Sequence, residues 1–424
     1  MKLSLVGRWS MALFASLALG LGMTACGGGT IGYMWVLGQQ YNQIVGFKVD
    51  DFSGNLTEVP GAPFSSNGSV PVSLVVKTGG RYVYVINQGV GGSATGPGTG
   101  QTIALYSVGG DGSLSYQQSY HSQGYISQWA QMDSSGTFLY VLDKYSPGVN
   151  AMSGLYDAAN TDGNGSITVF AADVNTGRLS LVTNAQTQVN GVNTPFWEVG
   201  PAPIMSKSQG GCLFTVNSGQ TNNVQTVTPY TIGSSGQLVN VTTGNIIITP
   251  TTGTATNITS INGGGSFIFL TDAANNIIYG YSEGGTCGLN ALNGGTTANI
   301  AGTANPVYSM LTTTGSLTYL YVLNGSPNDT LPTTPNSNIS AFSINSSNQE
   351  LQPITGAPYT VGSGPVCMVE DPTNQYVYIS NHNDGTVTGK TFNSTTGELA
   401  QLSKGSTFAA SGLAGCLAIS GAID

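Results

Sequence analysis

The sequence predicts an all-β fold, a seven-bladed β-propeller built from four-stranded antiparallel blades. Charged residues make up only 7% of the chain and glycine accounts for 61 of its 424 residues. That composition disfavours long helices, because glycine and short polar or β-branched residues weaken them. Hydrophobic residues, 40% of the total, fall in short regular runs that are typical of packed strands. One such run recurs seven times, which indicates a repeat architecture.

The recurring run consists of five apolar or aromatic residues and a closing residue that is usually Asn or Asp, as in Tyr82-Val-Tyr-Val-Ile-Asn87. Its seven copies are 49 to 74 residues apart and begin at Tyr33, Tyr82, Phe138, Cys212, Phe267, Tyr319 and Tyr376. A short apolar strand, often led by proline, precedes each copy. An alternating strand and a turn of the type Gly112-Ser-Leu114 follow most copies. Four antiparallel strands per repeat make a propeller blade.

The two ends of the chain predict how the ring closes. The first copy, at Tyr33, has no first strand before it, and the final stretch from Gly415 to Ile419 matches the first-strand pattern without a second strand after it. We therefore expect the C-terminal strand to complete the N-terminal blade. Closure of this kind removes exposed sheet edges.

The first 25 residues are typical of a bacterial lipoprotein signal peptide. Lys2 and Arg8 precede an apolar run that is too short to span a bilayer comfortably. The segment that ends in Thr24-Ala-Cys26 resembles a lipobox, so we expect acylated Cys26 to anchor the protein to a membrane. An ordinary signal peptide with a chance cysteine is the alternative. Residues 26–32 then form the lipidated cysteine and its tether, residues 33–424 form the propeller, and the expected location is the cell envelope, at the outer membrane.

Charge and cysteine content exclude several classes of protein. Without the leader, eight basic residues face nineteen acidic ones, a net charge of about −11. No basic stripe is present, so we expect no nucleic-acid partner. No Cys-x-x-Cys pair occurs and no cofactor is expected.

Four cysteines remain after the leader, and in an exported protein they permit disulfides with three connectivities. Cys367 and Cys416 belong to first strands of blades that adjoin after closure, so they are the first candidate pair. Cys212 and Cys287 lie in consecutive blades and form the second.

Long insertions predict which face of the propeller binds a ligand. Loops that join the first strand to the second, and the third to the fourth, are short and share one face, the short-loop face. The other loops share the long-loop face and contain all the long insertions, at residues 88–100, 144–165, 183–200 and 325–337. Such insertions often mark a binding side, although neutral decoration is the alternative.

A few residues of the long-loop face have chemistry of their own. His121, His382 and Glu198 are weak candidates for activating water, and ordinary turn or surface roles are favoured for both histidines. Asp157, Asp162 and Asn164 are weak candidates for calcium ligands, because oxygen-rich loops bind calcium. Their spacing differs from an EF-hand, so turn formation is favoured here too.

The Tyr-Val-Tyr-Val-Ile-Asn and Gly-x-Leu motifs resemble the repeats of lactonase-type seven-bladed propellers, which include 6-phosphogluconolactonase and many YVTN-repeat surface proteins. The resemblance covers residues 33–424 and implies the fold. It also implies a central site of His, Arg and Glu, but the only arginines after the leader, Arg81 and Arg178, fall in tight turns. Fold alone does not confer activity. The leading hypothesis is therefore a non-catalytic propeller that binds a glycan, peptide or small molecule, and the alternative is a lactone hydrolase.

Overall fold

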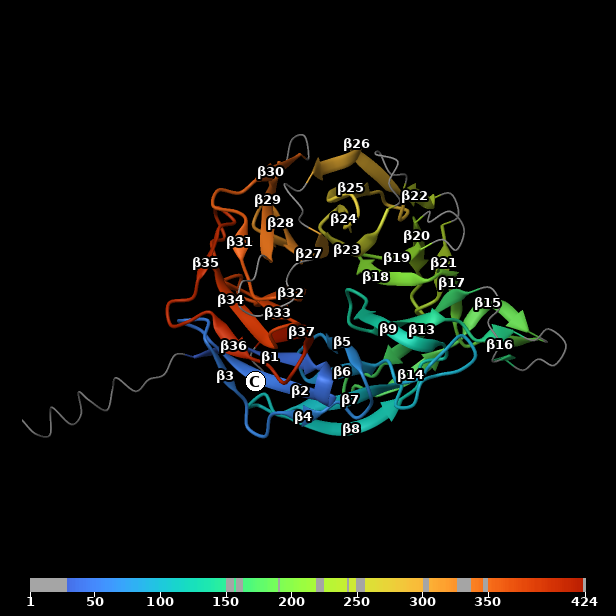
Figure 1. The fold of residues 1–424 in the computed structure, drawn as a ribbon. Coiled ribbons are helices and arrows are strands. Elements are labelled where there is room, and N and C mark those ends of the chain that lie inside the picture. Colours follow the sequence, from blue (N-terminus) through green and yellow to red (C-terminus); the bar gives the residue numbers. More distant parts are fainter. Residues whose placement is uncertain are drawn as a thin grey trace, which may run out of the picture.

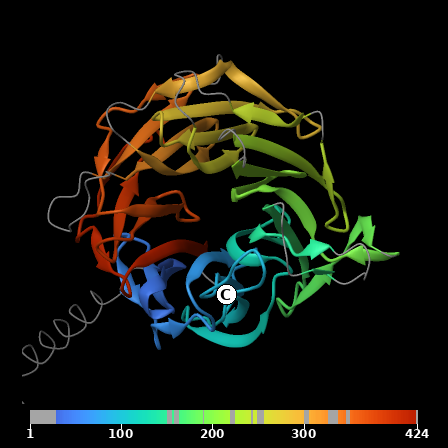
Figure 2. The same ribbon diagram turned by 45° about the vertical axis from the view of Figure 1, so that its right-hand side comes forward.

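A computed structural model shows seven antiparallel sheets arranged as blades around a central axis (Figures 1 and 2). It describes residues 29–149, 156–157, 163–189, 191–218, 225–241, 244–248, 256–299, 305–325, 337–345 and 350–421. Within these residues helix is confined to short 3-10 turns such as η2 (Gln39–Tyr41). None of the described residues forms a helix that is long and apolar enough to cross a membrane.

Each blade places four strands side by side in chain order from the axis outward, apart from the first blade. From inner to outer, blade 2 consists of β5 (Pro71–Val76), β6 (Tyr82–Asn87), β7 (Thr102–Val108) and β8 (Leu114–Tyr120). Blade 3 consists of β9 (Tyr125–Met132), β10 (Phe138–Tyr145), β13 (Asn164–Ala172) and β14 (Leu179–Val182). Blade 4 consists of β18 (Pro203–Gln209), β19 (Cys212–Ser218), β20 (Gln225–Ile232) and β21 (Leu238–Asn240). Blade 5 consists of β23 (Ile258–Gly264), β24 (Phe267–Asp272), β25 (Ile277–Glu283) and β26 (Leu289–Asn299). Blade 6 consists of β27 (Pro306–Thr314), β28 (Leu317–Asn324), β29 (Asn338–Ile344) and β30 (Leu351–Pro353). Blade 7 consists of β32 (Pro365–Glu370), β33 (Tyr376–Asn381), β34 (Thr386–Phe392) and β35 (Leu399–Gln401).

The first blade confirms the predicted closure. It combines β1 (Thr30–Gly38), β2 (Gln43–Asp50) and β3 (Leu56–Glu58) with the last strand of the chain, β37 (Ala414–Gly421). β37 pairs antiparallel with β1, for example at Trp35 and Ala418, and so becomes the innermost strand. The seven-bladed fold expected from the repeats is therefore present.

The outer edge of most blades differs from a simple fourth strand. In five blades the third strand pairs with two short segments, because the chain bends between them. The additional segments are β4 (Phe64–Ser65), β17 (Trp197–Pro201), β22 (Ile246–Ile248), β31 (Tyr359–Thr360) and β36 (Thr407–Ala409).

Neighbouring blades are joined by the aromatic residues of the recurring run. The Tyr84 hydroxyl donates a hydrogen bond to the Gly177 carbonyl oxygen of the next blade at 2.7 Å, and Tyr321 does the same to Gly397 at 2.6 Å. In blade 1 the Trp35 indole N–H reaches the Gly112 carbonyl at 3.1 Å. The recurring run and the Gly-x-Leu turn are thus two halves of one interface between blades.

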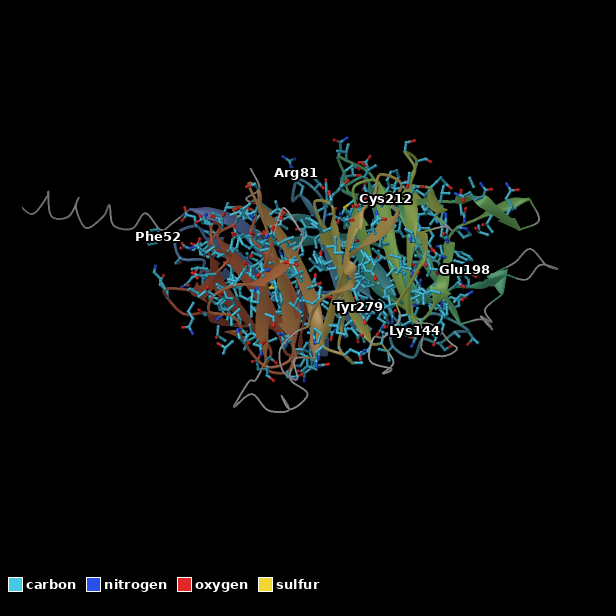
Figure 3. All side chains as sticks on the ribbon, turned by 90° about the horizontal axis from the view of Figure 1, so that it is seen from above. Phe52, Arg81, Lys144, Glu198, Cys212 and Tyr279 are labelled. Carbon is cyan, nitrogen blue, oxygen red and sulfur yellow. A yellow bond between two sulfur atoms is a disulfide. The ribbon has the colours of Figure 1, made fainter. Side chains whose placement is uncertain are left out.

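Two faces of the ring differ as expected, with one correction. Figure 3 shows Arg81 on the short-loop face and Lys144 on the opposite side. The insertion 183–200, however, folds into the hairpin β15 (Asn184–Val189) and β16 (Val192–Thr194), which projects from the outer rim of blade 3 (Figure 1). It does so because β17 pairs with β13 and draws the insertion to the edge of the sheet. The insertion 144–165 includes the short strands β11 (Gly148–Val149) and β12 (Tyr156–Asp157).

Candidate functional site

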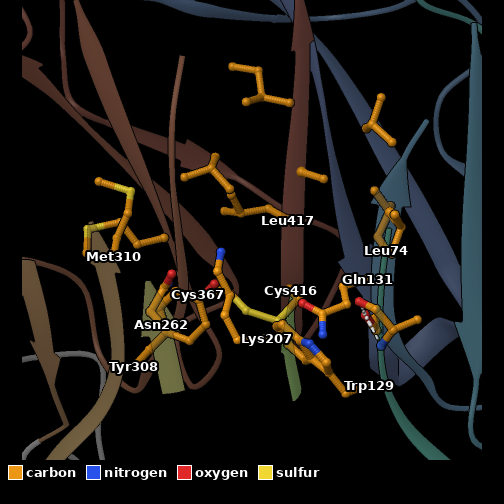
Figure 4. Close-up of a pocket in the computed structure, with 18 of the residues that line it drawn as sticks. Leu74, Trp129, Gln131, Lys207, Asn262, Tyr308, Met310, Cys367, Cys416 and Leu417 are labelled. Atoms are coloured by element: carbon orange, nitrogen blue, oxygen red, sulfur yellow. Dashed lines mark hydrogen bonds between the residues drawn. A yellow bond between two sulfur atoms is a disulfide. The ribbon is translucent and has the colours of Figure 1, made fainter. Parts of the chain in front are cut away.

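Two of the cavities in the described part of the propeller matter for function, and these two share no lining residue. The first, the inner cavity, has a volume of about 500 Å³ and is lined by the innermost strands of all seven blades (Figure 4). The second, the long-loop mouth, has a volume of about 490 Å³ and lies at the long-loop ends of blades 2 to 5. Both volumes are in the range of about 300–1,000 Å³ that is usual for ligand sites.

The long-loop mouth has a polar rim above apolar side chains. Its apolar residues are Val72, Ala202, Pro203 and Ile204, and its polar ones are Gln88, Gln128, Lys144, Gln225 and Asn257. The Gln225 side-chain oxygen accepts a hydrogen bond from the Ile258 backbone N–H at 2.6 Å. This contact joins blades 4 and 5, so the oxygen is already used within the fold.

The other four polar side chains of the mouth have unused hydrogen-bonding capacity. Gln88, Gln128, Lys144 and Asn257 make no side-chain hydrogen bond or ion pair within the described part of the chain, and the Gln128 side-chain oxygen is buried. The Lys144 ammonium lies 5.4 Å from the centre of the Tyr145 ring, within range of a cation–π contact. An unpaired buried polar group such as the Gln128 oxygen is costly, so its place beside three more polar side chains with free capacity favours a ligand that pairs with them.

The amides of the inner cavity are occupied by contacts between blades. The Gln131 amide donates to the Ser206 hydroxyl at 3.0 Å and accepts from the Ser208 backbone N–H at 2.6 Å. Asn262 donates to the Ser309 carbonyl at 2.5 Å. These side chains bind inner strands to one another and have little capacity left for a ligand.

Two charged residues, Glu370 and Lys207, line the inner cavity, and they differ in their hydrogen-bond partners. The Glu370 carboxylate accepts hydrogen bonds from the Thr312 hydroxyl and, at 2.7 Å, from the Asn374 amide. Burial raises the pKa of Glu370, and these hydrogen bonds offset part of the rise. Burial also lowers the pKa of Lys207, whose ammonium has no partner among the described residues.

Lys207, Glu370, Gln128 and Asn257 were not identified from the sequence, whereas Gln88 and Lys144 begin two of the insertions that predicted the binding face. The signal for the first two is a charged residue in the second half of a first strand that begins with proline, in β18 and β32 respectively. First strands line the axis, so their polar residues face it or the neighbouring inner strand. No local signal identifies the rim, because its residues come from four blades.

The structure does not bring the candidate catalytic residues together. The His121 imidazole is exposed and lies 3.2 Å from the Gln101 carbonyl, whereas His382 Nδ1 lies 2.9 Å from the Ala414 carbonyl in another blade. Glu198 is exposed on β17 at the outer rim of blade 3, where it pairs with Ser166 near the long-loop end of β13, away from the axis. None of the three lines either axial cavity.

Of the three calcium candidates, only Asn164 has a described side chain. Asp162 is outside the described residues, and Asp157 is placed only as part of β12. The Asn164 amide donates to the Glu198 carboxylate at 2.7 Å. Among the described residues no group of three or more His, Cys, Asp or Glu could hold a metal ion.

Both candidate disulfides are present in the structure. Cys367 of β32 is joined to Cys416 of β37, with 5.1 Å between their Cα atoms, and this bond forms part of the inner cavity wall. Cys212 of blade 4 is joined to Cys287 of blade 5, with 5.6 Å between Cα atoms. Each bond links two neighbouring blades.

The arginines stay away from both cavities. Arg81 and Arg178 are exposed in the turns β5–β6 and β13–β14 on the short-loop face, and neither lines an axial cavity. A cationic cluster of arginines at the axis, as the lactonase resemblance implies, is therefore missing from the described part of the chain.

Comparisons with known proteins rest on structure alone, since no protein-family model and no curated protein matches the sequence. A candidate 6-phosphogluconolactonase from Bacteroides fragilis aligns over 92% of this chain and 98% of its own, with a TM-score of 0.65 and 15% identity. A similar candidate from Bacteroides uniformis aligns over 92% of this chain and all of its own, with a TM-score of 0.65 and 14% identity. The periplasmic gluconolactonase of Pseudomonas aeruginosa aligns over 93% of this chain and all of its own, with a TM-score of 0.64 and 15% identity. At these identities the likeness concerns the fold, and the chain shares the seven-bladed architecture of these lactonase-like propellers.

Proposed function

We propose that this protein is an exported, lipid-anchored propeller that binds a polar small molecule in the long-loop mouth without transforming it. One observation carries the proposal: four polar side chains with unused hydrogen-bonding capacity surround a cavity of about 490 Å³. Gln88 comes from blade 2, Gln128 and Lys144 from blade 3, and Asn257 precedes the first strand of blade 5.

The chemistry of the rim favours a hydroxylated ligand. Side-chain amides both donate and accept hydrogen bonds, which matches hydroxyl groups that do the same. Val72 and Ile204 offer apolar surface for the C–H face of a sugar ring. A single ammonium group, Lys144, gives no cluster of fixed positive charge for a phosphate. We therefore infer a neutral or singly charged saccharide as the ligand class.

Saturation-transfer NMR on the full chain with maltose, cellobiose and D-gluconate tests this inference. We expect transfer from at least one probe, and at least about tenfold weaker binding in Gln88→Ala/Asn257→Ala, since several hydrogen bonds are lost. Arg81→Ala, on the opposite face, is the matched control and should bind as the parent does. No transfer from any of the three sugars, or equal binding by the double variant, would contradict the inference.

The membrane anchor is a separate part of the proposal. It is supported by the leader and by Thr24-Ala-Cys26, which lie outside the described residues. Cys26→Ser should abolish labelling by a radioactive or clickable fatty acid and move the protein from the membrane fraction to the soluble one, because the acyl chains provide the attachment. A variant that remains in the membrane fraction would show that the lipobox interpretation is wrong.

Lactone hydrolysis is the second candidate function, and similarity to structures described as lactonases favours it. Hydrolysis needs a group to activate water and donors for the oxyanion. The described lining of the long-loop mouth contains no imidazole and no carboxylate, and the carboxylate of the inner cavity, Glu370, already accepts hydrogen bonds from Thr312 and Asn374. We therefore expect no appreciable hydrolysis of 6-phosphogluconolactone or glucono-1,5-lactone in a pH-stat assay. Turnover that is lost in His382→Ala or His121→Ala would establish the enzyme instead.

A further inference from the structure

The inner cavity is lined by a lysine whose ammonium makes no ion pair or hydrogen bond with any described residue. Lys207 lies on β18, the innermost strand of blade 4, and its side chain extends into the cavity (Figure 4). No hydrogen bond or ion pair reaches its ammonium from any described residue. The buried Lys77 differs, because its ammonium donates to the Gly136 carbonyl at 2.9 Å.

Among the polar groups of the inner cavity, the Lys207 ammonium and the buried indole N–H of Trp129 have no partner among the described residues, and Lys207 is the charged one. Gln131 and Asn262 are held by serines of neighbouring inner strands. The Glu370 carboxylate is held by Thr312 and Asn374. An ammonium surrounded by protein gains more from an anion than an exposed one does, because the effective dielectric constant is lower.

The walls of the cavity decide what kind of anion fits. Leu74, Met310 and Leu417 face the cavity from blades 2, 6 and 1, and Trp129 and Tyr308 approach each other with their ring centres 6.5 Å apart. A bare inorganic anion would leave this apolar surface uncovered. An anion with an apolar body would cover it and gain the free energy of that burial.

We propose that the inner cavity is a binding site for a small monocarboxylate, with its carboxylate on Lys207 and its apolar body against Leu74, Met310 and Leu417. The site is separate from the long-loop mouth, and the proposal does not depend on a sugar binding there. Glu370 lines the same cavity and sets the charge of the ligand, since a second carboxylate would meet a like charge.

Titration calorimetry of the purified full chain tests the proposal with three probes of one shape. Benzoate should bind, and benzamide, its neutral analogue, should bind at least about tenfold more weakly, because a charge-assisted hydrogen bond is lost. Phthalate, with a second carboxylate, should also bind more weakly than benzoate. Equal binding of benzoate and benzamide would overturn the proposal, and this comparison needs no variant.

Two lysine variants assign the site. Lys207→Met keeps an unbranched apolar side chain and should weaken benzoate at least about tenfold, with no change for benzamide. Lys390→Met is the matched control, because it removes another lysine, a buried one on β34 that lies outside both axial cavities. Unchanged benzoate binding in Lys207→Met, or equal losses in both variants, would overturn the assignment.

Discussion

Single polar side chains at the ends of the second strands fix the adjacent strand or the link into their blade. The Asn87 amide donates to the Ser66 carbonyl at 2.9 Å, in the link from the preceding blade, and to the Thr102 hydroxyl at 3.0 Å. The Asn381 amide donates to Thr386 and Thr388 of the adjacent strand at 3.0 and 2.9 Å. The Asn or Asp that closes each recurring run is therefore explained by folding, and a ligand is not needed to account for it.

Asp143 occupies this position in blade 3 and makes the stability of the protein depend on pH. Its carboxylate is fully buried and accepts hydrogen bonds from Ser122, Ser127 and Thr168. Burial raises its pKa to about 6, whereas hydrogen bonds lower it in part. An unfolded chain has an Asp pKa of about 3.9, so the folded state binds more protons between pH 4 and 6 and this contribution to stability is lost as pH rises through that window.

The variant Asp143→Asn should remove this contribution. The shift of about two units corresponds to about 3 kcal/mol, and we expect the parent to lose up to that amount relative to the variant between pH 4 and pH 7. Urea unfolding of both proteins at each pH measures the difference, and other carboxyl groups cancel because both proteins share them. A variant whose free energy of unfolding changes with pH as the parent's does would contradict the assignment to Asp143.

Turns of the Gly-x-Leu type act as docking elements between blades. Gly177 has φ +66°, and a Cβ there would lie 2.5 Å from the Tyr82 ring of the preceding blade. Gly112 and Gly397 meet Tyr33 and Tyr319 in the same way, at 2.2 and 2.6 Å. The leucine two residues later is buried in each of these turns. The glycine thus provides both the left-handed backbone and the room for a neighbouring aromatic ring.

Gly177→Ala separates these two roles when it is compared with Gly210→Ala. Gly210 has φ +56° in another turn of the short-loop face, and its Cβ would meet nothing within 4 Å. Both variants pay roughly 1–2 kcal/mol for the left-handed backbone, and only Gly177→Ala must also displace Tyr82. We expect a clearly larger drop in thermal midpoint for Gly177→Ala. Equal drops for the two variants would show that the ring does not depend on this close approach.

The strands and turns could be predicted from the sequence because the repeat is encoded locally. The recurring run, as in β6, the alternating strand that follows it, as in β7, and the Gly-x-Leu turn can each be recognised within a few residues. The outer position of Glu198 was not predictable, because it depends on the pairing of β17 with β13, whose partners Ser166 and Glu198 are 32 residues apart in the sequence. The long-loop mouth escaped prediction for a similar reason: Gln88 and Asn257 are distant in sequence and meet only when blades 2 and 5 surround the axis.

The molecule as a whole depends on contacts that run around the axis. Gln131 joins blades 3 and 4, Asn262 joins blades 5 and 6, and Thr312 joins blades 6 and 7 through Glu370. The disulfide from Cys367 to Cys416 joins blade 7 to the closing strand β37. Both axial cavities exist only within the closed ring, so ligand binding and ring closure are expected to be coupled.

Deletion of residues 413–424 tests the closed ring directly. It removes β37, which exposes the inner edge of β1 and leaves Cys367 without its partner. An unpaired edge favours aggregation, so the shortened chain should elute as large aggregates and unfold at a lower temperature than the parent.

Cys367→Ser/Cys416→Ser is the control that keeps the strand. It should lose about 2–4 kcal/mol of stability through the missing cross-link and still elute as the parent does. A shortened chain with the elution volume and thermal midpoint of the parent would contradict a ring closed by its last strand, whereas aggregation of both variants would assign the closure mainly to the disulfide.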